Sequence, residues 1–172
     1  MSKKNTPSAR FAIGFVLVLA VISGGVYLAF SNFQRQAAER RRMASQENLV
    51  EIHEALSDYA AKNKGLFPER AALLLPNYLT NGRALINPAW PDETGYIYIP
   101  GARNDDSQDT ILVYENVPAR KRKLGIQVLI RSGSIYTMAE SKFEEALKVQ
   151  EEMWKRTGRV WLPDAMTSRE MK

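Results

Sequence analysis

The sequence predicts an α+β protein, in which a long N-terminal helix packs on a small antiparallel sheet and a second helix follows near the C-terminus. Three observations support this fold class. An apolar run at 11–30 continues into a stretch without proline, segments rich in β-branched and aromatic residues follow between 96 and 138, and helical periodicity returns from Glu140 to Thr157. A chain of 172 residues has room for such a helix and one compact domain.

The long helix is predicted to extend to residue 64, because Gly65 and Pro68 supply its stop signals. In its second half, four side chains recur at helical spacing and form one apolar stripe. These stripe residues, which we expect to hold the helix against the sheet, are Leu49, Ile52, Leu56 and Tyr59. The sequence predicts a basic N-terminal segment at 1–10, a transmembrane helix at 11–30 and its amphipathic continuation at 31–64. An α+β globular region at 65–158 and a tail at 159–172 follow.

Residues 11–30 form an uncharged apolar run that is long enough to cross a bilayer as one helix. A cleaved signal peptide is the competing interpretation, but the run exceeds the usual apolar length of such peptides and ends in Phe30 without a small-residue cleavage site. The run therefore predicts a single-pass anchor in membrane lipids. Small residues at a spacing of four would permit self-association through this helix. They are the pairs Ala20 and Gly24, and Gly25 and Ala29.

Positive charge lies on both sides of the apolar run, and the formal net charge of the chain is +5. Lys3, Lys4 and Arg10 precede the run, whereas Arg35 and a cluster at 40–42 follow it. The positive-inside rule therefore does not choose between the two orientations. We expect the protein in the inner (cytoplasmic) membrane, with its N-terminus inside and its globular domain outside the cytoplasm. A cytoplasmic globular domain is the alternative.

The second half of the chain predicts strands and short helices. Residues 71–79 resemble a short helix, and strands are predicted at 96–100, 111–116 and 125–130, with a turn leading into a further strand at 134–138. This order is typical of an antiparallel meander. After the helix predicted from Glu140, the tail has no periodicity and is expected to trail over the surface.

The composition excludes several kinds of chemistry. The chain has no cysteine, so it has no disulfide, thiolate nucleophile or cysteine-based metal site. Its single histidine, His53, lies on the apolar side of the long helix, where a packed histidine is more common than a catalytic one. The sequence contains no zinc-protease, P-loop or dinucleotide-binding motif. It therefore predicts a protein that is not an enzyme and has no resident cofactor.

Carboxylates cluster in the loop between the first two predicted strands. They are Asp105, Asp106 and Asp109. Carboxylate oxygens suit a hard cation, so calcium is one interpretation of this loop. Their spacing is not that of an EF-hand, and a solvated turn between strands explains them equally well.

A basic cluster lies between the second and third predicted strands. It consists of Arg120, Lys121, Arg122 and Lys123. Clustered positive charge attracts polyanions such as nucleic acid or an acidic partner. A solvated loop that discourages edge-to-edge aggregation is the favoured interpretation, and nucleic acid is the less favoured partner.

Two segments resemble the type IV pilin and type II secretion pseudopilin superfamily. The first is similar to the family's run N-L-x-x-I-x-x-A-L-x-x-Y-x-x-x-N-x-G-x-F-P, and its matching residues are Asn48, Leu49, Ile52, Ala55, Leu56, Tyr59, Asn63, Gly65, Phe67 and Pro68. The second, at 96–116 and 128–147, resembles pilin-like proteins whose sheet ends in V-L-F-A-D-G-H-V before a short acidic helix. The resemblance covers roughly 48–148 and implies a sheet resting on the outer half of a long spine helix.

The chain departs from the family pattern at two places. Ser132 and Ser134 stand where the family has aspartate and histidine, while Gly133 between them is retained. The family's peptidase signal reads Gly-Phe-Thr-Leu-x-Glu, and the nearest stretch here begins at Gly14 and has Leu19 in place of the glutamate. The chain therefore resembles a variant of the family.

The resemblance implies a non-enzymatic, membrane-anchored protein that makes protein contacts within a type II secretion or type IV pilus-type system. Its partners would then be other membrane or secretion-apparatus proteins. The absence of the glutamate favours an alternative from another class. This is a membrane-tethered extracytoplasmic binding module of the same fold that does not polymerise and recognises a polyanion through residues 120–123.

Overall fold

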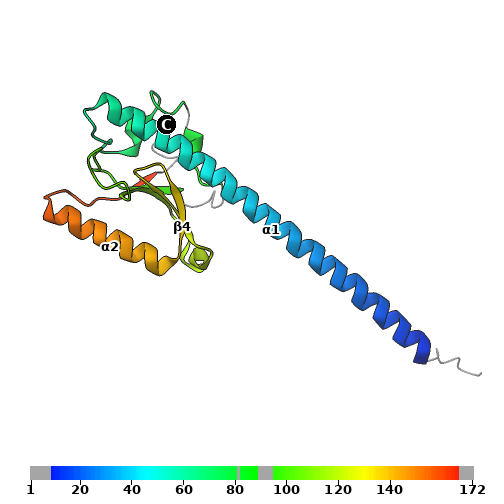
Figure 1. Ribbon diagram of the computed structural model, residues 1–172. Helices are drawn as coiled ribbons and strands as arrows, with labels where there is room; N and C mark the ends of the chain where they lie inside the picture. The colour runs from blue at the N-terminus through cyan, green and yellow to red at the C-terminus, as the bar shows by residue number, and fades with distance from the viewer. Residues whose placement is uncertain (1–8, 81, 89–94, 167–172) are drawn as a thin grey trace, which may run out of the picture. The chain divides into compact units, whose positions relative to one another are not determined.

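The computed structural model describes residues 9–80, 82–88 and 95–166, with side chains from residue 25 onward except for 119–121 and 165. The chain divides into two compact units, residues 1–40 and 41–172. The described helices and strands (Figure 1) are α1 (Ala9–Lys62), η1 (Ala71–Leu74), η2 (Gly82–Leu85), β1 (Tyr96–Tyr98), β2 (Ile111–Glu115), η3 (Ala119–Leu124), β3 (Ile126–Ile130), β4 (Ile135–Met138), α2 (Glu140–Arg156) and β5 (Asp164–Met166). These elements confirm the predicted α+β class, with a long N-terminal helix, an antiparallel sheet and a C-terminal helix.

The first unit contains the N-terminal part of α1. Over the part of the chain that the structure describes, no helix combines the length and the apolar character needed to cross a membrane. This finding contradicts the predicted single-pass location in the inner membrane. Among the described side chains the apolar run ends at Phe30, and the polar residues Ser31, Asn32 and Arg35 follow at once. Residues 11–24 of the predicted span lie outside the described side chains, and the predicted self-association pair Ala20 and Gly24 lies among them.

In the second unit, α1 supplies one side of the hydrophobic core. Leu49, Ile52 and Leu56 are fully buried, and Tyr59 is partly buried against the same cluster of side chains. These residues are spaced three or four apart, so they share one helix face. Burial of that face against the sheet is the main reason why this part of the helix is stable.

The end of α1 is fixed by local hydrogen bonds. The Gly65 N–H donates to the Ala60 carbonyl at 2.8 Å, and the Asn63 side-chain amide donates to the Tyr59 carbonyl at 2.7 Å. Gly65 has a φ of +80°, which a glycine adopts without steric cost. Carbonyls that α1 itself would leave unpaired are therefore satisfied at the predicted stop signal.

The sheet has five antiparallel strands in the order β4-β3-β2-β1-β5. The first four form the predicted meander. A register shift between Ile111 and Val113 interrupts the pairing of β2 with β3. Because successive side chains of a strand point to opposite faces, neighbours on β2 contact different helices. Tyr114 packs on Phe143 of α2, with ring centroids 4.9 Å apart, whereas Glu115 bonds to α1.

The tail contributes a strand, which the sequence did not predict. Asp164–Met166 forms β5 and pairs with β1, so that Met166 lies opposite Tyr96 and is buried. The prediction that the tail trails over the surface is therefore wrong for these residues. The predicted short helix at 71–79 is a single 3₁₀ turn, η1, followed by turns.

Candidate functional site

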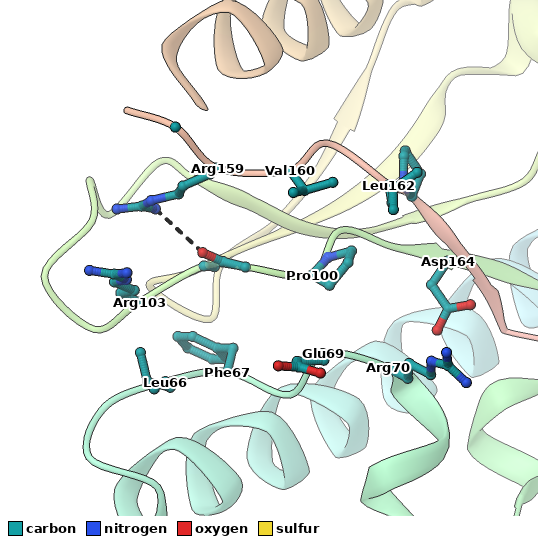
Figure 2. Close-up of a pocket in the computed structure, with 14 residues that line it drawn as sticks. Leu66, Phe67, Glu69, Arg70, Pro100, Arg103, Arg159, Val160, Leu162 and Asp164 are labelled. Atoms are coloured by element: carbon teal, nitrogen blue, oxygen red, sulfur yellow. Dashed lines mark hydrogen bonds between the residues drawn. The ribbon is translucent and has the colours of Figure 1, made fainter. Parts of the chain in front are cut away.

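A groove with a volume of about 650 Å³ lies in the second unit, where three segments meet. The segments are 66–70 after α1, 100–103 after β1 and 158–164 after α2. Figure 2 shows Val160 and Leu162 on one wall of the groove, with Leu66, Phe67 and Glu69 on the opposite wall. The site is therefore built from parts of the chain that are far apart in sequence.

Hydrogen bonds of backbone and side-chain groups hold these segments in place. The Phe67 N–H donates to the Ala102 carbonyl at 3.2 Å, and the Ala71 N–H donates to the Asp164 carboxylate at 3.1 Å. The buried hydroxyl of Tyr98 donates to the Pro68 carbonyl at 2.7 Å. Each wall is thus fixed to a neighbouring strand or loop, so the groove is formed before any ligand enters.

An ion pair closes one end of the groove. The Arg159 guanidinium lies 2.6 Å from the Asp106 carboxylate and also donates to the Gly101 carbonyl at 3.4 Å, the bond drawn as a dashed line in Figure 2. Burial alone would raise the pKa of Asp106. The hydrogen bonds from Arg159 and from the Arg103 N–H, together with the charges of both arginines, outweigh burial and lower this pKa.

The rim of the groove is apolar and carries two further arginines. Leu66, Val160 and Leu162 are 47%, 68% and 67% exposed. Arg70 and Arg103 are exposed, and neither forms a salt bridge with the described part of the chain. In the view of Figure 2 the two guanidinium groups lie toward opposite ends of the groove. Apolar surface between two cations suits a ligand that carries apolar groups flanked by carboxylates.

The acidic loop is engaged by the chain itself. Asp106 accepts the Arg159 ion pair and the Arg103 N–H at 2.8 Å, whereas Asp105 and Asp109 are exposed. Among the described residues, no group of three or more acidic, histidine or cysteine side chains is placed to hold a metal ion. The loop is therefore explained by its ion pair, and the calcium interpretation gains no support there.

The basic cluster is divided in the structure. Arg122 lies 3.2 Å from Glu140 and 3.9 Å from Glu144, near the start of α2, and its Nε donates to the Val117 carbonyl at 3.3 Å. Lys123 is exposed. The side chains of the other two predicted members, Arg120 and Lys121, lie outside the described residues. Arg122 thus joins η3 to α2, and binding of a polyanion stays a prediction.

His53 lies in the contact between α1 and the turn after β3. Its Nε2 donates to the Arg131 carbonyl at 3.2 Å, and the Ser57 hydroxyl lies 3.5 Å from the same nitrogen. The ring also lies against Gly133, where a Cβ would come within 2.8 Å of its Cε1. This environment is that of a packing residue at the interface of helix and sheet.

Comparison with known proteins identifies no relative of this chain. The chain matches no protein-family model, no curated protein sequence and no solved structure.

The groove was not predicted from the sequence. Arg70, Arg103 and Arg159 are separated by long stretches of chain, and none lies in a motif. Only the β5 pairing and the hydrogen bonds between loops bring them to one place. The one local signal was the apolar run from Val160 to Pro163 near the start of the tail.

Proposed function

We propose that this chain is a non-enzymatic, pilin-like protein that makes protein contacts within a multi-subunit assembly of the type IV pilus or type II secretion kind. The resemblance of residues 48–68 and 96–147 to that superfamily supports the proposal. The arrangement of α1, the antiparallel meander and α2 is compatible with it.

The observation that carries the proposal is an exposed apolar stripe on the first unit. Val26, Phe30 and Phe33 are 64%, 61% and 68% exposed. They follow one another at spacings of four and three, so they lie on one face of α1. Tyr27 and Leu28, which are 72% and 62% exposed, extend this apolar surface to other faces of α1, and the polar residues Asn32 and Arg35 follow along the helix. A contiguous apolar face of this kind is typical of a surface that another polypeptide covers.

The proposal is tested with the full chain and a variant that changes only this stripe. Phe30→Gln with Phe33→Gln removes the two aromatic rings and keeps good helix formers. Tyr136→Gln, at an exposed aromatic residue of β4, is the matched control. Sedimentation velocity and chemical cross-linking across a concentration series report the size of the assembly. We expect large species for the parent chain and the control, and loss of these species in the double variant.

Two results would contradict the proposal. The parent chain could sediment as a monomer at every concentration and in the presence of the candidate apparatus proteins. Alternatively, the double variant could assemble as well as the control, in which case the apolar stripe makes no contact. Circular dichroism of each variant would verify that α1 is still helical, so that loss of assembly is not loss of structure.

A further inference from the structure

One wall of the groove carries backbone groups that the sheet leaves unpaired. Val160, Trp161 and Leu162 lie between α2 and β5. Within the part of the chain that the structure describes, their N–H and C=O groups neither donate nor accept a hydrogen bond. Backbone groups are strong donors and acceptors that bond to any complementary group within reach. This wall can therefore accept the backbone of another polypeptide.

Two prolines explain why the sheet leaves this segment unpaired. The pairing of β5 with β1 ends where Asp164 lies opposite Tyr98. In the same register, Pro163 would come next on one strand, and Pro100 on the other strand would lie opposite Leu162. Proline has no N–H to donate, so the ladder cannot continue across these positions. Both prolines line the groove, which opens where the two strands cease to pair.

Exposure alternates along this segment as it does along a strand. Val160 and Leu162 are 68% and 67% exposed, whereas Trp161 is half-buried and its ring stands edge-on to that of Trp154, with centroids 5.3 Å apart. Trp161 and the ion pair of Arg159 hold the segment in place. In an extended chain, the N–H and C=O groups of alternate residues point to the same edge. One added strand can therefore bond both Val160 and Leu162.

The rest of the groove offers apolar surface for the side chains of such a strand. Leu66, on the opposite wall, is 47% exposed. Figure 2 shows Pro100 between the wall that carries Val160 and the wall that carries Phe67. The volume of about 650 Å³ lies within the range of about 300–1,000 Å³ that is usual for ligand sites. The groove therefore suits a few residues of a peptide and not a folded domain.

We propose that the groove binds an extended apolar peptide segment of a partner protein, which adds as a strand along residues 160–162. Hydrogen bonds between the two backbones would hold the peptide, and its alternate side chains would pack on Leu66 and Pro100. Addition of a strand to a free backbone edge is a recurring mode of peptide recognition. The unpaired backbone beside the apolar surface favours a peptide over an apolar small molecule, which has no N–H groups to offer.

The short length of the free edge predicts weak binding. Exposed strand edges invite unwanted pairing, and short edges with a neighbouring proline limit it. Residues 160–162 followed by Pro163 have both of these features. We expect a dissociation constant of about 0.1–1 mM for a short peptide. The inference goes beyond the proposed function, because it involves neither the stripe on α1 nor assembly.

Peptide titration followed by nuclear magnetic resonance tests the inference. The protein is the full-length chain with Phe30→Gln and Phe33→Gln, which leave the groove unchanged and are designed to prevent assembly. The probes are three acetylated pentapeptide amides in which threonine alternates with valine, leucine or phenylalanine. We expect at least one probe to shift the amide signals of residues 66–70, 100–103 and 160–162. Hydrogen exchange at Val160 or Leu162 should become slower, because a bonded amide exchanges only when it opens.

An N-methylated form of the best probe separates backbone pairing from simple apolar contact. Methylation of every peptide nitrogen keeps the side chains and removes the N–H donors, while the protein itself is unchanged. The lost hydrogen bonds should weaken binding roughly tenfold. Equal affinity of the two forms would overturn the inference, because the groove would then recognise side chains alone.

A pair of protein variants tests where the peptide binds. Leu162→Asn removes apolar surface from the groove and should weaken binding of the best probe roughly fivefold. Leu124→Asn, at a leucine of η3 that is 61% exposed, is the matched control and should bind as the parent does. The amide spectrum of each variant verifies that the fold is intact. Equal weakening by the two substitutions would place the peptide elsewhere and would also overturn the inference.

The outcomes separate this inference from the proposed function. If none of the three probes binds at about 5 mM, well above the expected dissociation constant, the groove does not take an extended peptide and the inference fails. Assembly through the stripe on α1 would be unaffected by that result. Conversely, a parent chain that binds the peptide but never assembles would overturn the proposed function alone.

Discussion

The hydroxyl of Ser45 on α1 donates a hydrogen bond of 2.6 Å to Oε1 of Glu115 on β2, and both side chains are buried. The same carboxylate accepts the Asn87 side-chain amide at 3.0 Å and the Gln127 N–H at 3.2 Å. Burial raises the pKa of the Tyr96 hydroxyl, which lies 2.9 Å from Ser45 and stays a donor. This cluster ties α1 to β1, β2, β3 and the segment that holds Asn87, and it fixes the position of the helix on the sheet.

Replacing the carboxylate of Glu115 should destabilise the second unit. In Glu115→Gln, one oxygen that accepts hydrogen bonds becomes an NH₂ group facing donors, so at least one buried donor loses its partner. We expect a loss of about 1–3 kcal/mol in the free energy of unfolding. Urea unfolding followed by near-ultraviolet circular dichroism of the tryptophans measures it.

Glu145→Gln is the matched control for this substitution, because Glu145 is exposed and forms no salt bridge in the described chain. Its effect should stay within about 0.5 kcal/mol. Equal effects of the two substitutions would show that the buried cluster adds nothing to stability.

Elements with a local signal were predictable from the sequence. The stripe from Leu49 to Tyr59 repeats at helical spacing, and Gly65 follows it, so both the buried face of α1 and its end were evident. The four meander strands are rich in β-branched residues and lie between turns. For these segments, local preference and final packing agree.

Features that depend on distant partners were not predictable. The sequence of Asp164–Met166 has no alternation, and only pairing with Tyr96–Tyr98 makes it a strand. Likewise, the run of basic residues at 120–123 does not by itself indicate that Arg122 pairs with Glu140. The groove could not be predicted for the same reason, because its residues lie in three loops whose positions depend on hydrogen bonds between segments that are distant in sequence.

Gln150 of α2 completes the hydrogen bonding of a strand residue. Its amide accepts the Ile111 N–H at 2.8 Å and donates to the Ile111 carbonyl at 3.0 Å, and the side chain is buried. Gln150→Leu should leave both backbone groups unpaired and cost about 2–6 kcal/mol, the sum for two unsatisfied groups. The urea midpoint of this variant measures the loss. Val149→Leu, at its exposed neighbour, should leave the midpoint nearly unchanged, and a similar decrease in both would contradict this role.

The ion pair of Asp106 and Arg159 should make stability depend on pH. Because folding lowers the pKa of Asp106, the pair stabilises the protein fully above the ordinary carboxyl pKa, and the effect disappears as the pH falls through the lower folded value. Asp106→Asn should therefore cost about 1–3 kcal/mol at neutral pH and progressively less between about pH 5 and pH 2. Unfolding curves across this range measure the difference. Asp105→Asn, at an exposed neighbour, should show no such convergence, and a pH-independent cost of Asp106→Asn would contradict the ionic explanation.

The contact between His53 and Gly133 provides a test of how closely α1 approaches the turn after β3. Gly133 has a φ of +86°, and a Cβ there would lie 2.8 Å from Cε1 of the His53 ring. Gly158 has a φ of +69°, and nothing lies within 4 Å of a Cβ placed there. Gly158→Ala therefore reports backbone strain alone, roughly 1–2 kcal/mol.

Gly133→Ala should lower the free energy of unfolding in urea more than this control does, because backbone strain and the collision with the ring add. Combining Gly133→Ala with His53→Ala should recover part of that excess, since removing the ring relieves the collision. Equal costs at the two glycines would mean that the ring moves aside freely.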